Sequence, residues 1–152
     1  MSTYKDQLLD AGREFEGEYP YTLDTKGRLV FPAPFRDEFR DGLCVVPGLD
    51  GCLDVWTREG YGQRKRAAAR LPGGSLEARK LRRMTMSVVT LEMDGQHRVT
   101  LPQQLRDEFG LEREVTVFGN IDHVEIWDRG VFANYMADVR DSGTSFDTDF
   151  DL

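Results

Sequence analysis

Leu23-Asp24-Thr25-Lys26-Gly27-Arg28-Leu29-Val30-Phe31-Pro32 has a second version later in the same chain, Met93-Asp94-Gly95-Gln96-His97-Arg98-Val99-Thr100-Leu101-Pro102. The match continues from Arg36-Asp37-Glu38-Phe39 to Arg106-Asp107-Glu108-Phe109. Further along, Leu53-Asp54-Val55-Trp56 matches Val124-Glu125-Ile126-Trp127. Self-similarity of this extent indicates two tandem copies of one structural unit.

Each copy is predicted to run strand, turn, strand, short helix, strand, turn, strand, helix. Asp24–Gly27 and Asp94–Gln96 contain the residue types that favour turns. Pro32 and Pro102 end the strands that follow, because proline cannot donate a hydrogen bond to a sheet. One copy is too short to bury a sufficient core. We therefore predict a mixed α+β pseudo-dimer in which both copies share a small β-barrel about a pseudo-twofold axis, with helices at its periphery.

The chain is expected to have five consecutive parts. Polar and acidic residues dominate its C-terminal end, which favours disorder there. Leu71-Pro72-Gly73-Gly74 interrupts the helical pattern between the copies, and Ser75 is a suitable N-cap for a further helix. The expected parts are an N-terminal extension (1–14), a first repeat (15–60), a helical connector (61–86), a second repeat (87–139) and an acidic disordered tail (140–152).

The composition is that of a globular protein. The chain has 152 residues, a net charge of −7 and a pI of about 4.9, which argues against an extended nucleic-acid coat and gives no membrane-surface signal. Basic residues nevertheless gather between Tyr61 and Met86, so the overall charge does not exclude a local basic surface. No apolar run approaches the ~20 residues of a membrane span, and the first residues lack a signal-peptide pattern. We expect a cytoplasmic protein with no membrane partner.

The sequence lacks the common motifs of cofactor and metal chemistry. It has no phosphate-binding glycine loop and no Cys-x-x-Cys or His-x-x-x-His pair. Cys44 and Cys52 are interpreted as packing residues. We therefore predict no cofactor, no metal site, no small-molecule ligand and no catalytic residue. An enzyme using Asp94, His97 and Arg98 is a weak alternative, because the first copy has no histidine at the corresponding position.

The repeated Asp-x-x-x-Arg turns have two interpretations. Structurally, the aspartate caps turn amides and pairs with the arginine, an exposed pair worth on the order of 1 kcal/mol or less. Functionally, a two-stranded ribbon fits the major groove of DNA, where Arg binds guanine, Gln binds adenine and Lys or Thr binds phosphate. The candidate DNA-binding residues are Thr25, Lys26, Arg28, Gln96, His97 and Arg98, and the residues expected to shape the turns are Asp24, Gly27, Asp94 and Gly95.

The chain resembles the MraZ family over residues 15–139. Phe15–Tyr19, Leu23–Pro32 and Gly48–Leu53 are similar to its first half, and Asp94–Pro102 and Ile126–Asp128 to its second. Single copies of the motif occur in the wider SpoVT–AbrB group, which includes antitoxins, whereas the doubled motif points to MraZ.

The resemblance implies two AbrB-like swapped-hairpin repeats (β-β-α-β-β-α) in each subunit and a ring of many subunits. It also implies a transcriptional regulator, with repression the expected direction, that binds short direct repeats of double-stranded DNA in the promoter of the bacterial division and cell-wall gene cluster, on the nucleoid. Asp24 with Arg28 and Asp94 with Arg98 match the family's motif pairs, and Lys26 matches its basic tip residue. Gly95-Gln96-His97 departs from the basic residue and glycine usual in the second motif.

Two questions stay open at this level. One is whether the chain is instead an antitoxin-like protein-interaction module, in which the segment 141–152 or the connector binds a partner and DNA contact is secondary. The other is whether Arg64-Lys65-Arg66 contacts DNA or is a solvated helix face, which we favour.

Overall fold

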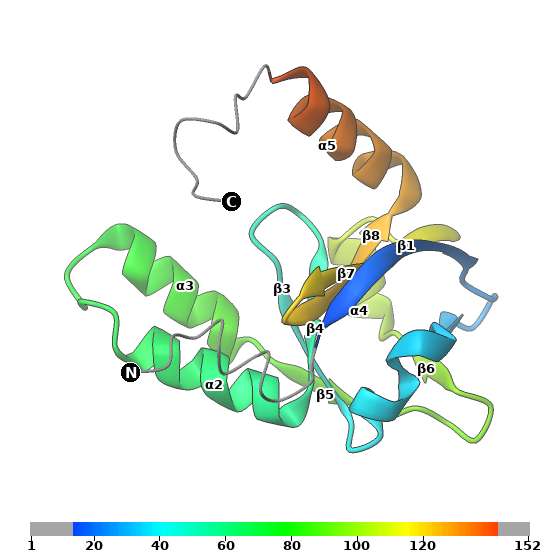
Figure 1. The fold of residues 1–152 in the computed structure, drawn as a ribbon, viewed down its shortest axis with the longest axis horizontal. Helices are drawn as coiled ribbons and strands as arrows, with labels where there is room; N and C mark the ends of the chain where they lie inside the picture. Colours follow the sequence, from blue (N-terminus) through cyan, green and yellow to red (C-terminus); the bar gives the residue numbers. More distant parts are fainter. Residues whose placement is uncertain (1–13, 143–152) are drawn as a thin grey trace.

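The computed structural model describes residues 14–142, and its elements repeat in the order that the sequence predicts (Figure 1). The first copy contains four strands, a short 3-10 helix and a longer helix, and the second copy contains four strands and a short helix before its own longer helix. The first set is β1 (Phe15–Thr22), β2 (Arg28–Val30), η1 (Ala33–Phe39), β3 (Leu43–Pro47), β4 (Leu53–Trp56) and α2 (Arg58–Ala69). After α3 (Leu76–Met86), the second is β5 (Val89–Leu91), β6 (Arg98–Thr100), α4 (Gln103–Glu108), β7 (Glu114–Ile121), β8 (His123–Asp128) and α5 (Arg129–Asp141).

The strands of the two copies pair with each other rather than within separate halves. One antiparallel sheet has the order β1-β7-β8-β4-β3-β5, and β2 pairs with β6 in a separate two-stranded ribbon. If each strand is exchanged with its counterpart in the other copy (β1 with β5, β2 with β6, β3 with β7, β4 with β8), both orders are the same read in reverse. The pseudo-twofold axis therefore passes between β4 and β8 and between β2 and β6.

The prediction of one closed barrel was wrong. The six-stranded sheet is open, with β1 and β5 at its edges. The strands β2 and β6 have three residues each, and their ladder bonds run to one another. Pro32 and Pro102, which follow these short strands, cannot extend the ladder. The ribbon is consequently too short to join the two sheet edges into a barrel.

The main core lies where the ribbon packs against the sheet. Alternate residues of the ribbon and its continuations point inward, as a period of two requires, and Leu29, Phe31, Val99 and Leu101 are fully buried. Aromatic rings of the first copy thicken this core, with centroids 5.3 Å apart for Phe15 and Phe39. Each turn that precedes a ribbon strand is thus anchored by buried residues directly after it.

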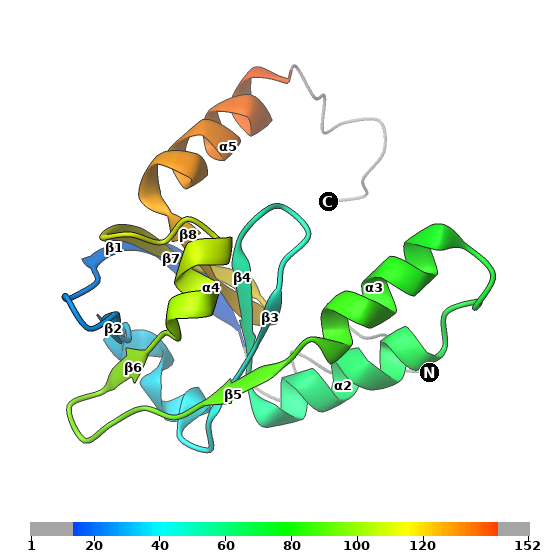
Figure 2. The same ribbon diagram turned by 180° about the vertical axis from the view of Figure 1, so that it is seen from behind.

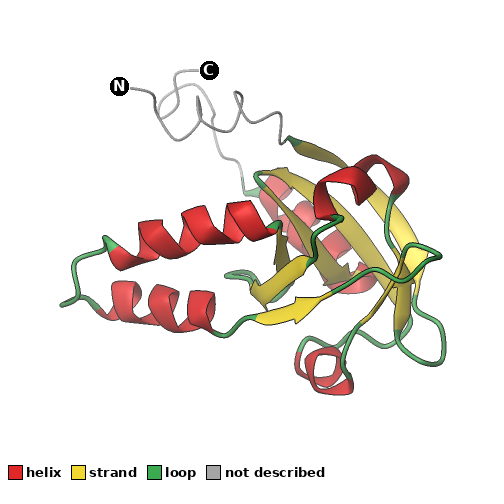
Figure 3. Cartoon of the chain, turned by 90° about the horizontal axis from the view of Figure 1, so that it is seen from below, coloured by secondary structure: helices red, strands yellow, loops and turns green. Residues whose placement is uncertain are grey.

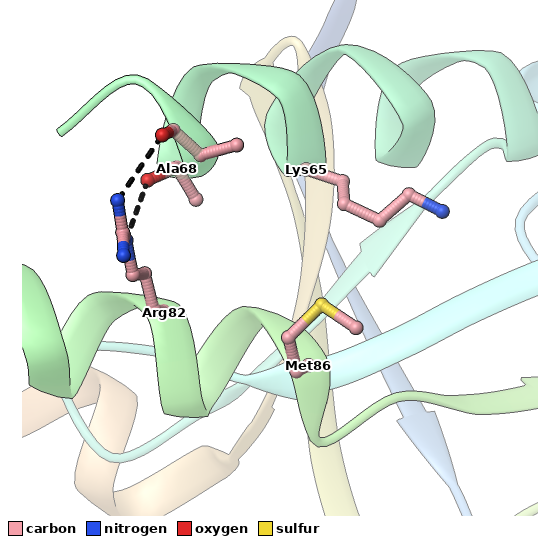
Figure 4. Close-up of a pocket in the computed structure, with 5 residues that line it drawn as sticks. Lys65, Ala68, Arg82 and Met86 are labelled. Carbon is pink, nitrogen blue, oxygen red and sulfur yellow. Dashed lines mark hydrogen bonds between the residues drawn. The ribbon is translucent and has the colours of Figure 1, made fainter.

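The connector is a helical hairpin that extends away from the strands (Figures 1 and 3). Thr57 caps α2 by accepting from Gly60 N at 2.9 Å, and Ser75 caps α3 by accepting from Ala78 N at 3.1 Å. The end of α2 before Leu71-Pro72-Gly73-Gly74 and the N-cap at Ser75 confirm the predicted interruption between two helices. Figure 4 shows a contact that the sequence did not predict, in which Arg82 of α3 reaches the C-terminal end of α2. Its guanidinium donates to the carbonyl oxygens of Ala68, Ala69 and Leu71.

The remaining helix, α5, projects from the end of β8, and its buried Phe132 packs on the outer face of the sheet, opposite the main core (Figure 2). Its Phe132 packs on Trp127, with ring centroids 5.4 Å apart. Residues 1–13 of the expected extension and 143–152 of the expected tail lie outside the described residues. Within residues 14–142, no helix combines the length and hydropathy that a bilayer span requires.

Candidate nucleic-acid interface

The first turn is organised around the carboxylate of Asp24. One of its oxygens, Oδ1, accepts from the backbone N–H groups of Lys26 and Arg28, each at 2.9 Å. The other, Oδ2, accepts a short hydrogen bond from Arg28 Nε. A backbone bond from Gly27 N to Asp24 O, at 3.0 Å, closes the turn. The aspartate therefore fixes both the backbone of the turn and the orientation of the arginine.

The second turn reproduces these bonds atom for atom. Asp94 Oδ1 accepts from Gln96 N at 2.8 Å and from Arg98 N at 3.0 Å, and Oδ2 accepts from Arg98 Nε at 2.9 Å. His97 N donates to Asp94 O at 3.0 Å. The different residues between Asp94 and Arg98 thus leave the hydrogen-bond pattern of the turn intact.

These bonds change the acidity of both aspartates. The pKa of Asp24 is lowered first by the backbone N–H of Arg28, and that of Asp94 first by the backbone N–H of Arg98. A carboxylate that accepts several hydrogen bonds favours its charged form. Both turns therefore contain an ionised aspartate at neutral pH.

The position before each arginine has left-handed backbone. The φ angle is +76° at Gly27 and +59° at His97. Gly95 was expected to shape the second turn as Gly27 shapes the first, but it corresponds to Thr25 and has open space around it. The second copy therefore places a histidine where the first has the residue best suited to this conformation.

The two turns are tied together across the pseudo-twofold axis. Phe31 N donates to His97 O, and Leu101 N donates to Gly27 O, both at 2.9 Å. The ribbon pairs Arg28 with Thr100 and Val30 with Arg98. Figures 1 and 2 show the loop before β2 and the loop before β6 at the same edge of the molecule. The structure thus brings together the candidate residues from both halves of the sequence.

This edge presents donors to solvent. Thr25, Lys26, Gln96 and His97 are exposed. The side chains of Arg28 and Arg98 are 30% and 27% exposed, respectively. Each arginine uses Nε for its aspartate, and among residues 14–142 its Nη groups make no hydrogen bond. The two arginines are therefore oriented, charged and still able to bind an acceptor.

Two further arginines, which are not among the predicted DNA-binding residues, lie beside the turns. Arg106 Nε donates to Leu101 O at 3.0 Å, and its guanidinium packs against Gly27. Arg36 Nε donates to Phe31 O at 2.8 Å in the equivalent place. Their signal was present in the sequence, since both occupy the same position in the two copies, four residues after a proline.

The arginine and lysine residues of α2 are placed differently. Arg64 lies over the ring of Trp56, 5.7 Å from its centroid, and Lys65 lies over Tyr61 at 5.5 Å. In Figures 1 and 2 the helical hairpin lies on the opposite side of the molecule from the turns. These residues therefore do not belong to the surface formed by the turns.

Asp94, His97 and Arg98 do not form the acid–base arrangement that the enzyme alternative requires. Asp94 binds Arg98 and three backbone N–H groups, and within the described part of the chain its carboxylate makes no hydrogen bond to the imidazole of His97. His97 is exposed to solvent.

A second cluster of titratable groups lies on the outer face of the sheet, away from the turns. His123 contacts Asp54, Asp122 and Glu125. Burial opposes the charge of His123, but the hydrogen bonds to Asp122 and Glu125 outweigh it and raise its pKa to about 9. Burial raises the pKa of Asp54 to about 6 and also raises that of the Cys52 thiol. Hydrogen bonds from His123, Asn120 and Trp127 lower the pKa of Glu125 despite its burial.

The comparison with known protein families agrees with the internal repeat. The family described as MraZ protein, antitoxin-like, matches this chain twice, over residues 15–84 and again over residues 84–151. The two matches cover both turns, the strands that pair across the pseudo-twofold axis and the helices between them. This chain is a member of the MraZ family, with two tandem copies of the family's repeat.

Proposed function

We propose that this protein is a sequence-specific DNA-binding regulator of transcription without catalytic activity. Membership of a regulator-like and antitoxin-like family supports the general class. The observation that carries the DNA-binding role is the pair of turns with identical hydrogen bonds at one edge of the molecule, each presenting an oriented arginine.

The turns have the chemistry that groove recognition needs. A two-stranded ribbon is narrow enough for the major groove, and an arginine held by its Nε can direct both Nη groups to guanine or phosphate. In this proposal Arg28 and Arg98 contact bases or phosphate, and Asp24 and Asp94 position them. Exposed side chains next to the arginines add contacts, to phosphate from Thr25 and Lys26 and to base edges from Gln96 and His97.

Assembly supplies the affinity that one subunit lacks. A subunit with a net charge of −7 is a weak ligand for a polyanion. A ring of many subunits would place several turn pairs on successive direct repeats, and effective concentration would then multiply weak contacts. We propose the promoter of the division and cell-wall gene cluster as the target, with repression as the outcome and the nucleoid as the location.

The experiment is binding of the full chain to its own upstream DNA over a range of salt concentrations. Arg28→Ala and Arg98→Ala should each weaken specific binding by about 1–3 kcal/mol, and Lys26→Ala should reduce the salt slope by about 1. Arg79→Ala, an exposed arginine on α3, is the matched control and should bind normally. Unchanged affinity of folded Arg28→Ala and Arg98→Ala would refute the proposal.

An antitoxin-like protein-interaction module is the second candidate, and the description of the family favours it. In that case the segment 141–152 or the connector would hold a protein partner. If the segment holds the partner, truncation after residue 140 should abolish capture of the partner while DNA binding persists. A truncated chain that retains both its protein partner and DNA binding would count against this candidate.

A further inference from the structure

Four side chains with metal-binding groups converge from both copies on the outer face of the sheet. Asp54 of β4 lies directly opposite Glu125 of β8 in the ladder. Cys52 directly precedes β4 and His123 begins β8, and because side chains alternate between the two faces of a strand, both lie on the same face as Asp54 and Glu125, two residues away. The alternate residues Leu53, Val55, Val124 and Ile126 belong to the main core. The register of β4 on β8 therefore assembles a cysteine, a histidine and two carboxylates.

Three of the spacings between ligand atoms are close to those in a coordination shell. Cys52 Sγ lies 3.5 Å from Asp54 Oδ1, and His123 Nε2 lies 3.6 Å from the same oxygen and 3.1 Å from Glu125 Oε2. Ligand atoms of Cys52, Asp54 and Glu125 all lie within 4.8 Å of one another. Zinc bonds of ~2.0–2.3 Å in a tetrahedron place neighbouring ligand atoms about 3.3–3.8 Å apart. Inward movement of the four side chains would bring their ligand atoms around one ion.

Residues outside the set of four hold these ligands in a binding orientation. His123 Nδ1 lies 2.7 Å from Asp122 Oδ1, so the imidazole directs Nε2 toward the cluster. Histidine ligands of metals characteristically donate their other ring nitrogen to a carboxylate in this way. Glu125 Oε1 accepts from Trp127 Nε1 at 2.9 Å, and Oε2 accepts from Asn120 Nδ2 at 3.0 Å. The ring of Trp56 stacks on that of His123 with centroids 4.6 Å apart.

The cluster is largely buried and still has room for an ion. The side chains of His123, Asp54 and Glu125 are 13%, 15% and 11% exposed, and Cys52 is 1% exposed. All four line a cavity of about 220 Å³. Carboxylates with such low exposure need charged or hydrogen-bonding partners, and a cation is one such partner.

We propose that Cys52, Asp54, His123 and Glu125 bind one divalent transition-metal ion of the zinc class. A thiolate, an imidazole and carboxylates are the ligands that Zn²⁺ takes in proteins. Cys52 and Asp54 come from the first copy, and His123 and Glu125 from the second. The ion therefore joins the two repeats across the pseudo-twofold axis and stabilises the folded chain. The sequence does not reveal the site, because its ligands form two pairs, each two residues apart, that lie about seventy residues from one another in the chain.

The experiment uses the full chain, stripped with EDTA, dialysed and titrated with Co²⁺ as a spectroscopic probe and with Zn²⁺ against a chromogenic chelator. We expect about one ion per chain, a thiolate-to-cobalt charge-transfer band and d–d bands of tetrahedral intensity. Zn²⁺ should also raise the melting temperature, since a ligand that binds only the folded state stabilises it. No DNA is present, so this result is independent of the proposed regulatory function.

Variants locate the ion. Cys52→Ser should abolish the charge-transfer band, and both Cys52→Ser and His123→Gln should weaken Zn²⁺ binding by at least about tenfold. Cys44→Ser is the matched control, because Cys44 is the other free cysteine and lies outside the cluster; it should retain the band. Absence of the band in the folded wild-type chain would overturn the proposal, even if the carboxylates alone bound Co²⁺. Unchanged Zn²⁺ affinity in folded Cys52→Ser would do the same.

Discussion

The carbonyl oxygen of Gly27 accepts a hydrogen bond from the backbone N–H of Leu101, at 2.9 Å. The equivalent bond in the other direction joins His97 O to Phe31 N, also at 2.9 Å. Each turn is therefore held by the residue that directly follows the ribbon strand of the other copy. The two turns form one mechanical unit, and a change in one is expected to affect the other.

Gly27→Ala should lower the free energy of unfolding by about 1–2 kcal/mol or more, because a Cβ atom crowds the backbone carbonyl in the left-handed conformation. The new Cβ would also stand 2.5 Å from Arg106 Cζ, so the arginine would have to move. Gly95→Ala is the control, since Gly95 has open space around it and no positive φ; it should change stability by less than about 0.5 kcal/mol. Urea denaturation measures both, and equal effects would contradict the explanation.

His97 should tolerate glycine better than a β-branched residue. His97→Gly relieves the left-handed strain but loosens the unfolded chain, so we expect a change between about 0 and +1 kcal/mol in stability. His97→Val should lower stability by at least about 1 kcal/mol, because φ is +59° at this position. Urea denaturation measures both variants. A stabilising His97→Val would contradict the left-handed conformation at this position.

Arg82→Ala should loosen the helical hairpin, because the guanidinium bonds three carbonyl groups at the end of α2. We expect the local stability of the hairpin to fall by about 1–2 kcal/mol, which would appear as faster amide hydrogen exchange in the last turns of α2. Arg82→Lys should recover only part of it, since a single ammonium cannot reach the same carbonyls as a planar fork. Arg79→Ala removes an exposed charge from the same helix and should leave exchange unchanged.

Asp24 and Asp94 should titrate below the ordinary value of 3.8 in a carboxyl ¹³C NMR titration. Because their pKa values are lowered in the folded chain, the stabilisation they provide is present above about pH 4 and is lost as the pH falls through those values. Arg28→Ala should move the pKa of Asp24 only part of the way back, since the largest cause is the backbone N–H of residue 28. A complete return to 3.8 would assign the effect to the guanidinium instead.

The sequence allowed the local features to be predicted. The duplication, both Asp-x-x-x-Arg turns and the Ser75 cap follow from short-range chemistry, because a side-chain oxygen finds amides two to four residues away whatever the rest of the chain does. The exposed tips Lys26 and Gln96 were selected for the same reason, and their role in DNA binding stays a prediction.

The longer-range features could not be predicted with equal success. The closed barrel was wrong because the lengths of β2 and β6 depend on where Pro32 and Pro102 stop a ladder that only the partner strand defines. The hydrogen bonds from Arg82 to the end of α2 and the packing of Arg106 against Gly27 join residues whose spacing in the chain has no periodic signal.

By itself, the sequence determined that this protein is a duplicated unit with two aspartate-capped turns and a helical connector, because each of these depends on neighbours within a few residues. The tertiary structure alone decided that both turns meet at one edge and that Cys52, Asp54, His123 and Glu125 gather on one face. The physical reason is strand register: pairing β4 with β8 and β2 with β6 sets distances between residues about seventy positions apart. Those pairings are selected by burial of the whole core rather than by any local pattern.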